Sequence, residues 1–286
     1  MSYTIDDLLK LLDLEPIEVN IYRGHNRDIG SGRVFGGQVL AQALVAAQRT
    51  VNPERIAHSV QGYFILPGDL NAPIVYFVDR LRDGKSFATR RVTAIQHGRA
   101  IFNMSASFHV RESGFEHQLP MPDVPPPESL RSELDVIREN AAQIPEKLRD
   151  VLTQDRPIDF RPVGFVDPFS PKPKPPIRHM WMRANGPMPD ETLAHQAVLC
   201  YASDYGLLGA ALQPHGRSVR NPDLQVASLD HTLWLHRECR IDDWLLYAID
   251  SPIASGARAF SRGTIFTKDG RLVASVAQEG LVRVRD

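Results

Sequence analysis

The sequence predicts an α+β protein built from two copies of one module, each with a buried helix and an antiparallel sheet. In both halves of the chain, a long apolar run is followed by strand-like runs that Asp-Gly or His-Gly turns separate. The two halves also share spaced landmarks: Gly98 follows His58 by 40 residues, and Gly270 follows His231 by 39. A repeat of this length indicates two similar units that pack against each other.

Length and composition limit the classes of protein to consider. A chain of 286 residues is long enough for two domains, and 43% hydrophobic with 23% charged residues is typical of soluble globular proteins. The net charge of -1 favours neither nucleic acid nor an anionic membrane surface as a partner. No apolar run approaches the ~18–20 residues that span a bilayer. Two cysteines and an acidic start without a basic segment predict a reduced, cytoplasmic protein without a signal peptide.

The first module begins after a short amphipathic helix, predicted over residues 5–12 with Thr4 as its cap. Gly36-Gly37-Gln38 opens a helical run over 39–51 that is apolar on nearly all sides, which predicts a buried helix. The strands that follow are predicted at residues 56–66, 73–81, 86–96 and 100–110.

The second module repeats this order. A strand over residues 177–183 precedes a helix over 191–203, for which Asp190 is the predicted cap. Further strands are predicted at residues 224–236, 244–250, 256–267 and 272–282. A sheet wrapped round one buried helix, present twice, corresponds to the double hotdog fold, which we predict by fold-level analogy.

A proline-rich segment separates the modules. Thirteen of the 22 prolines lie between Pro120 and Pro176, although residues 129–152 contain enough helix formers for one or two short helices. We therefore predict an N-terminal hotdog domain over residues 1–118, a connector over 119–176 and a C-terminal hotdog domain over 177–286.

Several familiar sites are missing from the sequence. It contains no G-x-S-x-G elbow, P-loop, G-x-G-x-x-G, H-E-x-x-H or C-x-x-C motif, and its ten histidines show no metal-ligand spacing. These absences argue against covalent-serine, nucleotide-hydrolysing and metal-dependent chemistry, and we expect neither a metal nor a cofactor.

A carboxylate ends one stripe of the second buried helix. Leu193, Ala197, Cys200, Tyr201 and Asp204 are spaced so that they share one helix face. Because a buried carboxylate is costly unless it is hydrogen-bonded, Asp204 is a candidate functional residue. The alternative is that Asp204 ends the helix and points to water.

An amide stands among apolar neighbours on the last strand. By alternation, Gln278 shares a face with Leu272, Ala274 and Val276, whereas the matching position of the first module is Ala106. A buried amide needs partners, so Gln278 is either a functional residue or a structural glutamine bonded to backbone.

The same alternation places Ser228 on a face with Asp230 and Thr232. Taken alone, it reads as an ordinary strand serine.

At these residues the chain resembles a known family, the acyl-CoA thioesterase II family of TesB-type double hotdog thioesterases. The similarity covers almost the whole chain in the same order. Its most specific segments are Arg33-Val34-Phe35-Gly36-Gly37-Gln38, Tyr63-Phe64-Ile65-Leu66-Pro67-Gly68-Asp69, Arg82-Asp83-Gly84-Lys85-Ser86-Phe87, Gly114-Phe115-Glu116-His117-Gln118, Gln213-Pro214-His215-Gly216, Leu229-Asp230-His231-Thr232-Leu233-Trp234 and Ala277-Gln278-Glu279-Gly280.

The resemblance implies a catalytic trio of Asp204, Ser228 and Gln278 in the C-terminal hotdog domain. Some members carry Thr where this chain has Ser228; serine keeps the hydroxyl and loses only a methyl group. His58 is a further polar candidate, since histidine has also been considered for this family. A core or interface histidine is the alternative.

The resemblance also implies the reaction, hydrolysis of a fatty acyl-CoA to a fatty acid and free CoA without a covalent intermediate. Asp204 would act as general base on water, while Ser228 and Gln278 would bond the water or the oxyanion. Basic side chains that could meet the CoA phosphates are Lys85, Arg90, Arg91, Arg258 and Arg262, although such charges are usually solvated strand faces. The family implies a homo-oligomer, a dimer or tetramer. From the net charge and the apolar runs we expect neither nucleic acid nor membrane as a partner.

Two other functions remain open from the sequence. Tyr201-Ala202-Ser203-Asp204 is superficially similar to the start of a hotdog hydratase motif, but the Asn-Pro-x-His continuation is absent. A non-catalytic acyl-CoA-binding protein is the second alternative, against which the full retention of the trio argues.

Overall fold

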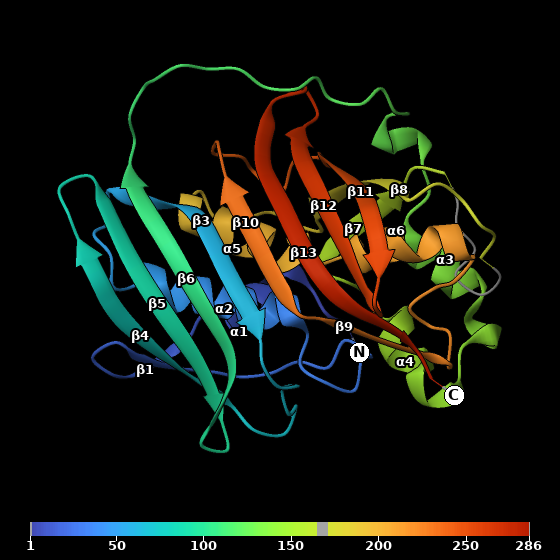
Figure 1. Ribbon diagram of the computed structural model, residues 1–286, viewed down its shortest axis with the longest axis horizontal. Coiled ribbons are helices and arrows are strands. Elements are labelled where there is room, and N and C mark those ends of the chain that lie inside the picture. The colour runs from blue at the N-terminus through green and yellow to red at the C-terminus, as the bar shows by residue number, and fades with distance from the viewer. Residues whose placement is uncertain (1, 165–170, 286) are drawn as a thin grey trace.

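One continuous sheet, with helices packed behind it, forms the body of the molecule in a computed structural model that describes residues 2–164 and 171–285 (Figure 1). The sheet has 13 strands in the order β1-β2-β4-β5-β6-β3-β10-β13-β12-β11-β8-β7, and β9 pairs with β13. Every strand pair within the described residues is antiparallel.

The N-terminal half supplies two helices and six strands among the described residues: α1 (Ile5–Leu12), β1 (Glu15–Glu18), β2 (Ile21–Gly24), α2 (Gly36–Gln48), β3 (Arg55–Phe64), β4 (Ile74–Asp83), β5 (Phe87–Gln96) and β6 (Arg99–Val110). The segment between the halves contains α3 (Glu133–Glu139), α4 (Glu146–Thr153) and β7 (Ile158–Pro162). The C-terminal half contains β8 (Ile177–Ala184), α5 (Thr192–Ser203), α6 (Leu207–Leu212), β9 (Leu224–Ser228), β10 (Asp230–Leu235), β11 (Leu245–Ser255), β12 (Arg258–Thr267) and β13 (Leu272–Val284).

The two halves repeat one arrangement and meet along β3 and β10, which pair in the middle of the sheet. Outward from this seam, β6, β5 and β4 on one side correspond to β13, β12 and β11 on the other. The same cross-strand ion pair occurs in both halves, between Arg91 and Asp79 and between Arg262 and Asp250. The repeat predicted from the sequence is therefore a repeat in space.

The central helices α2 and α5 lie side by side behind the sheet and are buried on most sides. A β-carbon added to Gly37 would lie 2.5 Å from the carbonyl oxygen of Tyr201, so the start of α2 touches the end of α5 with no room for a side chain. Near the other end of the pair, Gln48 donates a hydrogen bond from Nε2 to Oε1 of Gln196. This packing brings the N-terminus of α2 against the C-terminus of α5.

Local signals in the sequence predict some boundaries well and others poorly. Thr4 caps α1 as predicted, and its hydroxyl accepts a hydrogen bond from the backbone N–H of Asp7. The prediction of Asp190 as the cap of α5 is wrong, because Glu191 is the capping residue and its side chain makes no capping bond. The strand predicted over residues 224–236 is interrupted at Leu229 and forms β9 and β10.

The segment predicted as a connector contributes a strand, since β7 pairs with β8 at the edge of the sheet. Residues 165–170 of this segment lie outside the described residues. The limits of the two hotdog domains and of the connector stay a prediction.

Within the part of the chain that the structure describes, no helix has both the length and the apolar character needed to cross a bilayer.

Candidate active site

Asp204 caps the C-terminus of α5, and only 5% of its side chain is exposed. The residue does end the helix, but the alternative in which its carboxylate points to water is wrong. The side chain instead faces the start of α2: a β-carbon added to Gly36 would lie 2.8 Å from Oδ2 of Asp204 and 2.9 Å from the ring of Phe64. The absence of a side chain at Gly36 is what lets the carboxylate lie there.

Gln278 and Ser228 lie beside this carboxylate, so the structure brings together all three residues of the predicted trio. The side chain of Gln278 on β13 is buried, and its Nε2 donates a 2.7 Å hydrogen bond to Oγ of Ser228 at the end of β9. The alternative in which Gln278 bonds only to backbone is wrong, since its amide contacts side chains at both ends.

Ser228 reaches the site because of the break at Leu229. The backbone N–H of Leu229 donates to Glu279, and its carbonyl accepts from the N–H of Phe64. This interruption shifts the alternation, so that Ser228 and His231, three residues apart, both approach Gln278. The prediction that Ser228 shares a strand face with Asp230 and Thr232 is therefore wrong.

Burial sets the acidity of Asp204. Removal from water disfavours the charged carboxylate and raises its pKa from 3.8 to about 7. The backbone N–H of Gly37, the amide of Gln278 and the hydroxyl of Ser228 oppose this rise, because each stabilises the charged form. Among the described residues, Oδ1 of Asp204 is buried without a hydrogen-bond partner within normal distance. The result is a carboxylate that changes charge near neutral pH.

His231 is a fourth member of the site, and the sequence reasoning did not assign it. Its side chain is fully buried, with Nδ1 2.7 Å from Oε1 of Gln278 and 3.7 Å from Oδ1 of Asp204. The other ring nitrogen, Nε2, lies 2.9 Å from Oγ of Ser203. Alternation along β10 could have revealed it, since His231 shares the buried face of the strand with Leu233 and Leu235.

His58 lies elsewhere and contacts none of the trio. Its Nε2 is 2.8 Å from Oγ of Ser107, and its ring packs edge-on against Phe87 and His109. The pairing of β3 with β6 has a bulge at His58, between Ala57 and Ser59, and regular pairing resumes beyond it through Val60. His58 and His231 are matched landmarks in the sequence but occupy different environments in the fold.

The basic side chains suggested for CoA are mostly engaged in ion pairs. Arg90 is fully buried and bonded to Asp83 at 2.6 Å, which removes it from the candidates for binding phosphate. Arg91, Arg258 and Arg262 pair with acidic side chains on neighbouring strands, as the alternative of solvated strand faces predicts.

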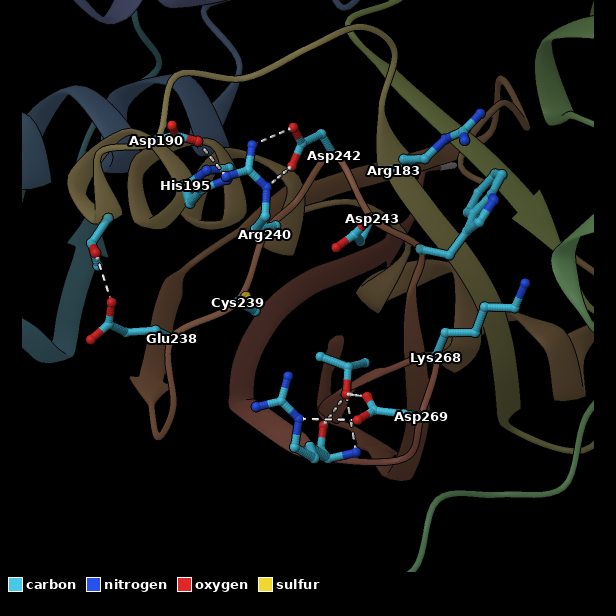
Figure 2. Close-up of a pocket in the computed structure, with 14 residues that line it drawn as sticks. Arg183, Asp190, His195, Glu238, Cys239, Arg240, Asp242, Asp243, Lys268 and Asp269 are labelled. Atoms are coloured by element: carbon cyan, nitrogen blue, oxygen red, sulfur yellow. Dashed lines mark hydrogen bonds and ion pairs between the residues drawn. The ribbon is translucent and has the colours of Figure 1, made fainter. Parts of the chain in front are cut away.

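A cavity of about 640 Å³ lies at the other end of α5 from Asp204 (Figure 2). Thr192 and His195 of the first turn of α5 line it, together with loops that follow β10 and β12. Two of its arginines pair with acidic residues that also line it: Arg240 with Asp190 and Asp242, and Arg271 with Asp269. None of the trio lines this cavity, so it is separate from the candidate active site.

Comparison with known proteins identifies the family. A family model described as acyl-CoA thioesterase matches residues 148–281, and one described as acyl-CoA thioesterase N-terminal domain matches residues 25–109. Over 283 residues, which cover 99% of both chains, the sequence is 40% identical to acyl-CoA thioesterase 2 of Haemophilus influenzae. The chain belongs to the acyl-CoA thioesterase family. The predicted family and enzyme class, a thioester hydrolase, are thus confirmed.

Solved structures support the fold as well. The acyl-CoA thioesterase II TesB2 of Mycobacterium marinum is 42% identical, with a TM-score of 0.80 over 98% of this chain and 99% of that one. A protein with a hot dog fold from Alicyclobacillus acidocaldarius, at 19% identity, has a TM-score of 0.77 over 98% of both chains. The second likeness bears on the fold alone, and together they confirm the predicted double hotdog of the α+β class.

Proposed function

We propose that this thioesterase hydrolyses fatty acyl-CoA to a fatty acid and CoA with a water molecule that Asp204, Ser228 and Gln278 hold. The observation that carries the proposal is the buried Asp204 carboxylate, with a pKa of about 7, beside an amide and a hydroxyl. A general base is most effective when its pKa lies near the working pH, because it is then both deprotonated and sufficiently basic.

In the proposed step, Asp204 removes a proton from water while the water oxygen bonds to the thioester carbon. Oδ1 of Asp204 has free lone pairs for this proton, since it lacks a hydrogen-bond partner among the described residues. Collapse of the tetrahedral intermediate breaks the carbon–sulfur bond and releases CoA as a thiolate, which then takes up a proton. A thiol has a pKa of roughly 8.5, so its thiolate leaves without a dedicated general acid.

Polar hydrogens around the carboxylate position the reactants. The amide of Gln278 and the hydroxyl of Ser228 bond the water or the developing oxyanion, which is the role of preorganised donors in acyl transfer. The N-terminus of α2 contributes the backbone N–H of Gly37 and the positive end of its dipole. Phe64 borders the same space and supplies an apolar wall, which suits an acyl chain.

The experiment that tests this function measures release of free thiol from a short-, a medium- and a long-chain saturated acyl-CoA. The proposal expects turnover that saturates with substrate and stoichiometric fatty acid. Saturable binding without thiol release would favour the non-catalytic binding protein instead. Consumption of a trans-2-enoyl-CoA with addition of water and no thiol release would favour the hydratase, because a hydratase needs an enoyl substrate.

Gly36→Ala is expected to lower kcat/KM by roughly 10²-fold, because the new β-carbon would stand 2.8 Å from Oδ2 of Asp204 and displace it. Gly114→Ala is the matched control, since a β-carbon there meets nothing within 4 Å and activity should be unchanged. Initial rates of thiol release and thermal unfolding of both variants decide the matter. Wild-type activity in folded Gly36→Ala would mean that the carboxylate does not work from this position.

We also propose a cytoplasmic location and a homo-oligomeric assembly. Free thiols at Cys200 and Cys239 support the first, because such thiols persist in reducing compartments. Exposed apolar side chains on the sheet, such as Phe77 and Trp234, support the second. Light scattering would measure the assembly, and a monomer at micromolar concentration would overturn it.

A further inference from the structure

The amide of Gln278 can stand in two orientations that have nearly the same shape. Oxygen and nitrogen ends of a glutamine amide are almost equal in size, so packing alone does not select between them. Their chemistry is opposite, since Oε1 only accepts hydrogen bonds and Nε2 only donates them. Only with Nε2 toward Ser228 does the amide also present donors to Asp204, whereas the reversed amide would turn an oxygen toward the carboxylate.

We propose that His231 is a positioning residue that locks Gln278 in the productive orientation; this inference rests on the proposed function of the trio. Nδ1 of His231 lies 2.7 Å from Oε1 of Gln278 at the end of the amide remote from Ser228. Because Oε1 can only accept, Nδ1 carries a hydrogen and donates it. Nε2 of Gln278 is then left free to serve Ser228 and Asp204.

Two contacts hold the imidazole in this neutral tautomer. The carboxylate of Asp204, whose Oδ1 is 3.7 Å from Nδ1, favours the hydrogen on Nδ1. Oγ of Ser203 lies 2.9 Å from Nε2 and 2.8 Å from the carbonyl oxygen of Cys200, and its single hydrogen can point to only one of these acceptors. With hydrogen on Nδ1 of His231, the hydroxyl donates to Nε2. Complete burial lowers the pKa of His231 to about 4 and keeps the ring uncharged at neutral pH.

The other half of the molecule supports the assignment. In its ladder, Ala106 stands opposite Val60 and Arg90, and in the second half Gln278 stands opposite Ser261. Thr232 pairs with Ala277, so the next pair between β10 and β13 is His231 and Gln278. His231 thus corresponds to Val60, which stands opposite Ala106 in the first half. The half that lacks the amide thus also lacks the imidazole, as expected if the two work as a unit.

A double-mutant cycle tests the proposal in the full-length protein. His231→Leu removes the donor, Gln278→Ala removes the amide, and both are compared with the double variant in thiol release from a saturated acyl-CoA. We expect His231→Leu to lower kcat by roughly tenfold with little change in KM, and to cause no further loss once Gln278 is alanine. A residue that only supports the core would instead give the same loss in both backgrounds, and that additivity would overturn the proposal.

A conservative variant separates donation from shape. His231→Asn carries an N–H near the position of Nδ1 and is expected to keep kcat within about threefold of wild type. A loss as large as that of His231→Leu would count against the proposal. Nitrogen-15 NMR of wild-type protein, with the His231 signal assigned from its loss in His231→Asn, should report hydrogen on Nδ1. Hydrogen on Nε2 would overturn the proposal even if His231→Leu fails to fold.

The same measurements distinguish the inference from the function beneath it. If Gln278→Ala has wild-type activity, the proposed role of the trio fails. If Gln278→Ala is impaired but the effects of the two variants multiply, the trio stands and only the role of His231 fails.

Discussion

Asp204→Asn is expected to reduce kcat/KM for acyl-CoA hydrolysis by at least ~10²-fold, because the amide cannot accept a proton from water. The substitution keeps the volume of the side chain and its place at the end of α5, where only 5% of the side chain is exposed. A loss that falls on kcat rather than KM would identify an interaction made in the transition state.

Asp230→Asn is the matched control, since Asp230 is a partly buried carboxylate whose pKa is likewise raised by burial. Its Oδ1 accepts a hydrogen bond from the backbone N–H of Glu279, and an asparagine oxygen can accept the same bond.

Wild-type kcat/KM should rise with pH through about 7, the pKa of Asp204, and level off above it, because only the deprotonated carboxylate acts as base. A pH-independent rate, or equal losses in both variants, would contradict the assignment of Asp204.

The sequence predicts the repeated architecture well because its signals are local. Alternation of apolar residues and Asp-Gly or His-Gly turns define each meander, and the apolar circumference of α2 predicts its burial. Capping at Thr4 is a short-range bond and is predicted correctly. β1, β2 and β7 were not predicted, since they are only four or five residues long and so show little alternation.

The candidate site was predicted in its members but not in its geometry. The resemblance to the family gives Asp204, Ser228 and Gln278, whereas spacing alone leaves each with a structural alternative. Two long-range features bring them together. One is the break at Leu229, which two backbone hydrogen bonds to other strands hold. The other is the contact between the start of α2 and the end of α5. His231 was used only as a landmark of the repeat, because its partner Gln278 lies 47 residues away.

The same burial that makes Asp204 a base should make it a burden on stability. The pKa of Asp204 is about 7 in the folded protein and 3.8 as the reference for the unfolded chain. Between these values the unfolded chain loses its proton while the folded protein keeps it, so stability falls as pH rises from 3.8 to about 7. Above that range the accumulated cost is about 4 kcal/mol, since each pKa unit corresponds to roughly 1.4 kcal/mol.

Asp204→Asn has no titrating group at this position and should escape that cost. Relative to wild type, its free energy of unfolding should increase by about 2 kcal/mol between about pH 5.5 and about pH 8.5. Chemical denaturation of both proteins at the two pH values measures this difference, and the comparison across pH cancels the effect of the substitution on packing. A constant difference would mean that Asp204 keeps an ordinary pKa, and its suitability as a base at neutral pH would be lost with it. A variant that is more stable at high pH but inactive would show that the site accepts a stability cost in order to hold a carboxylate away from water.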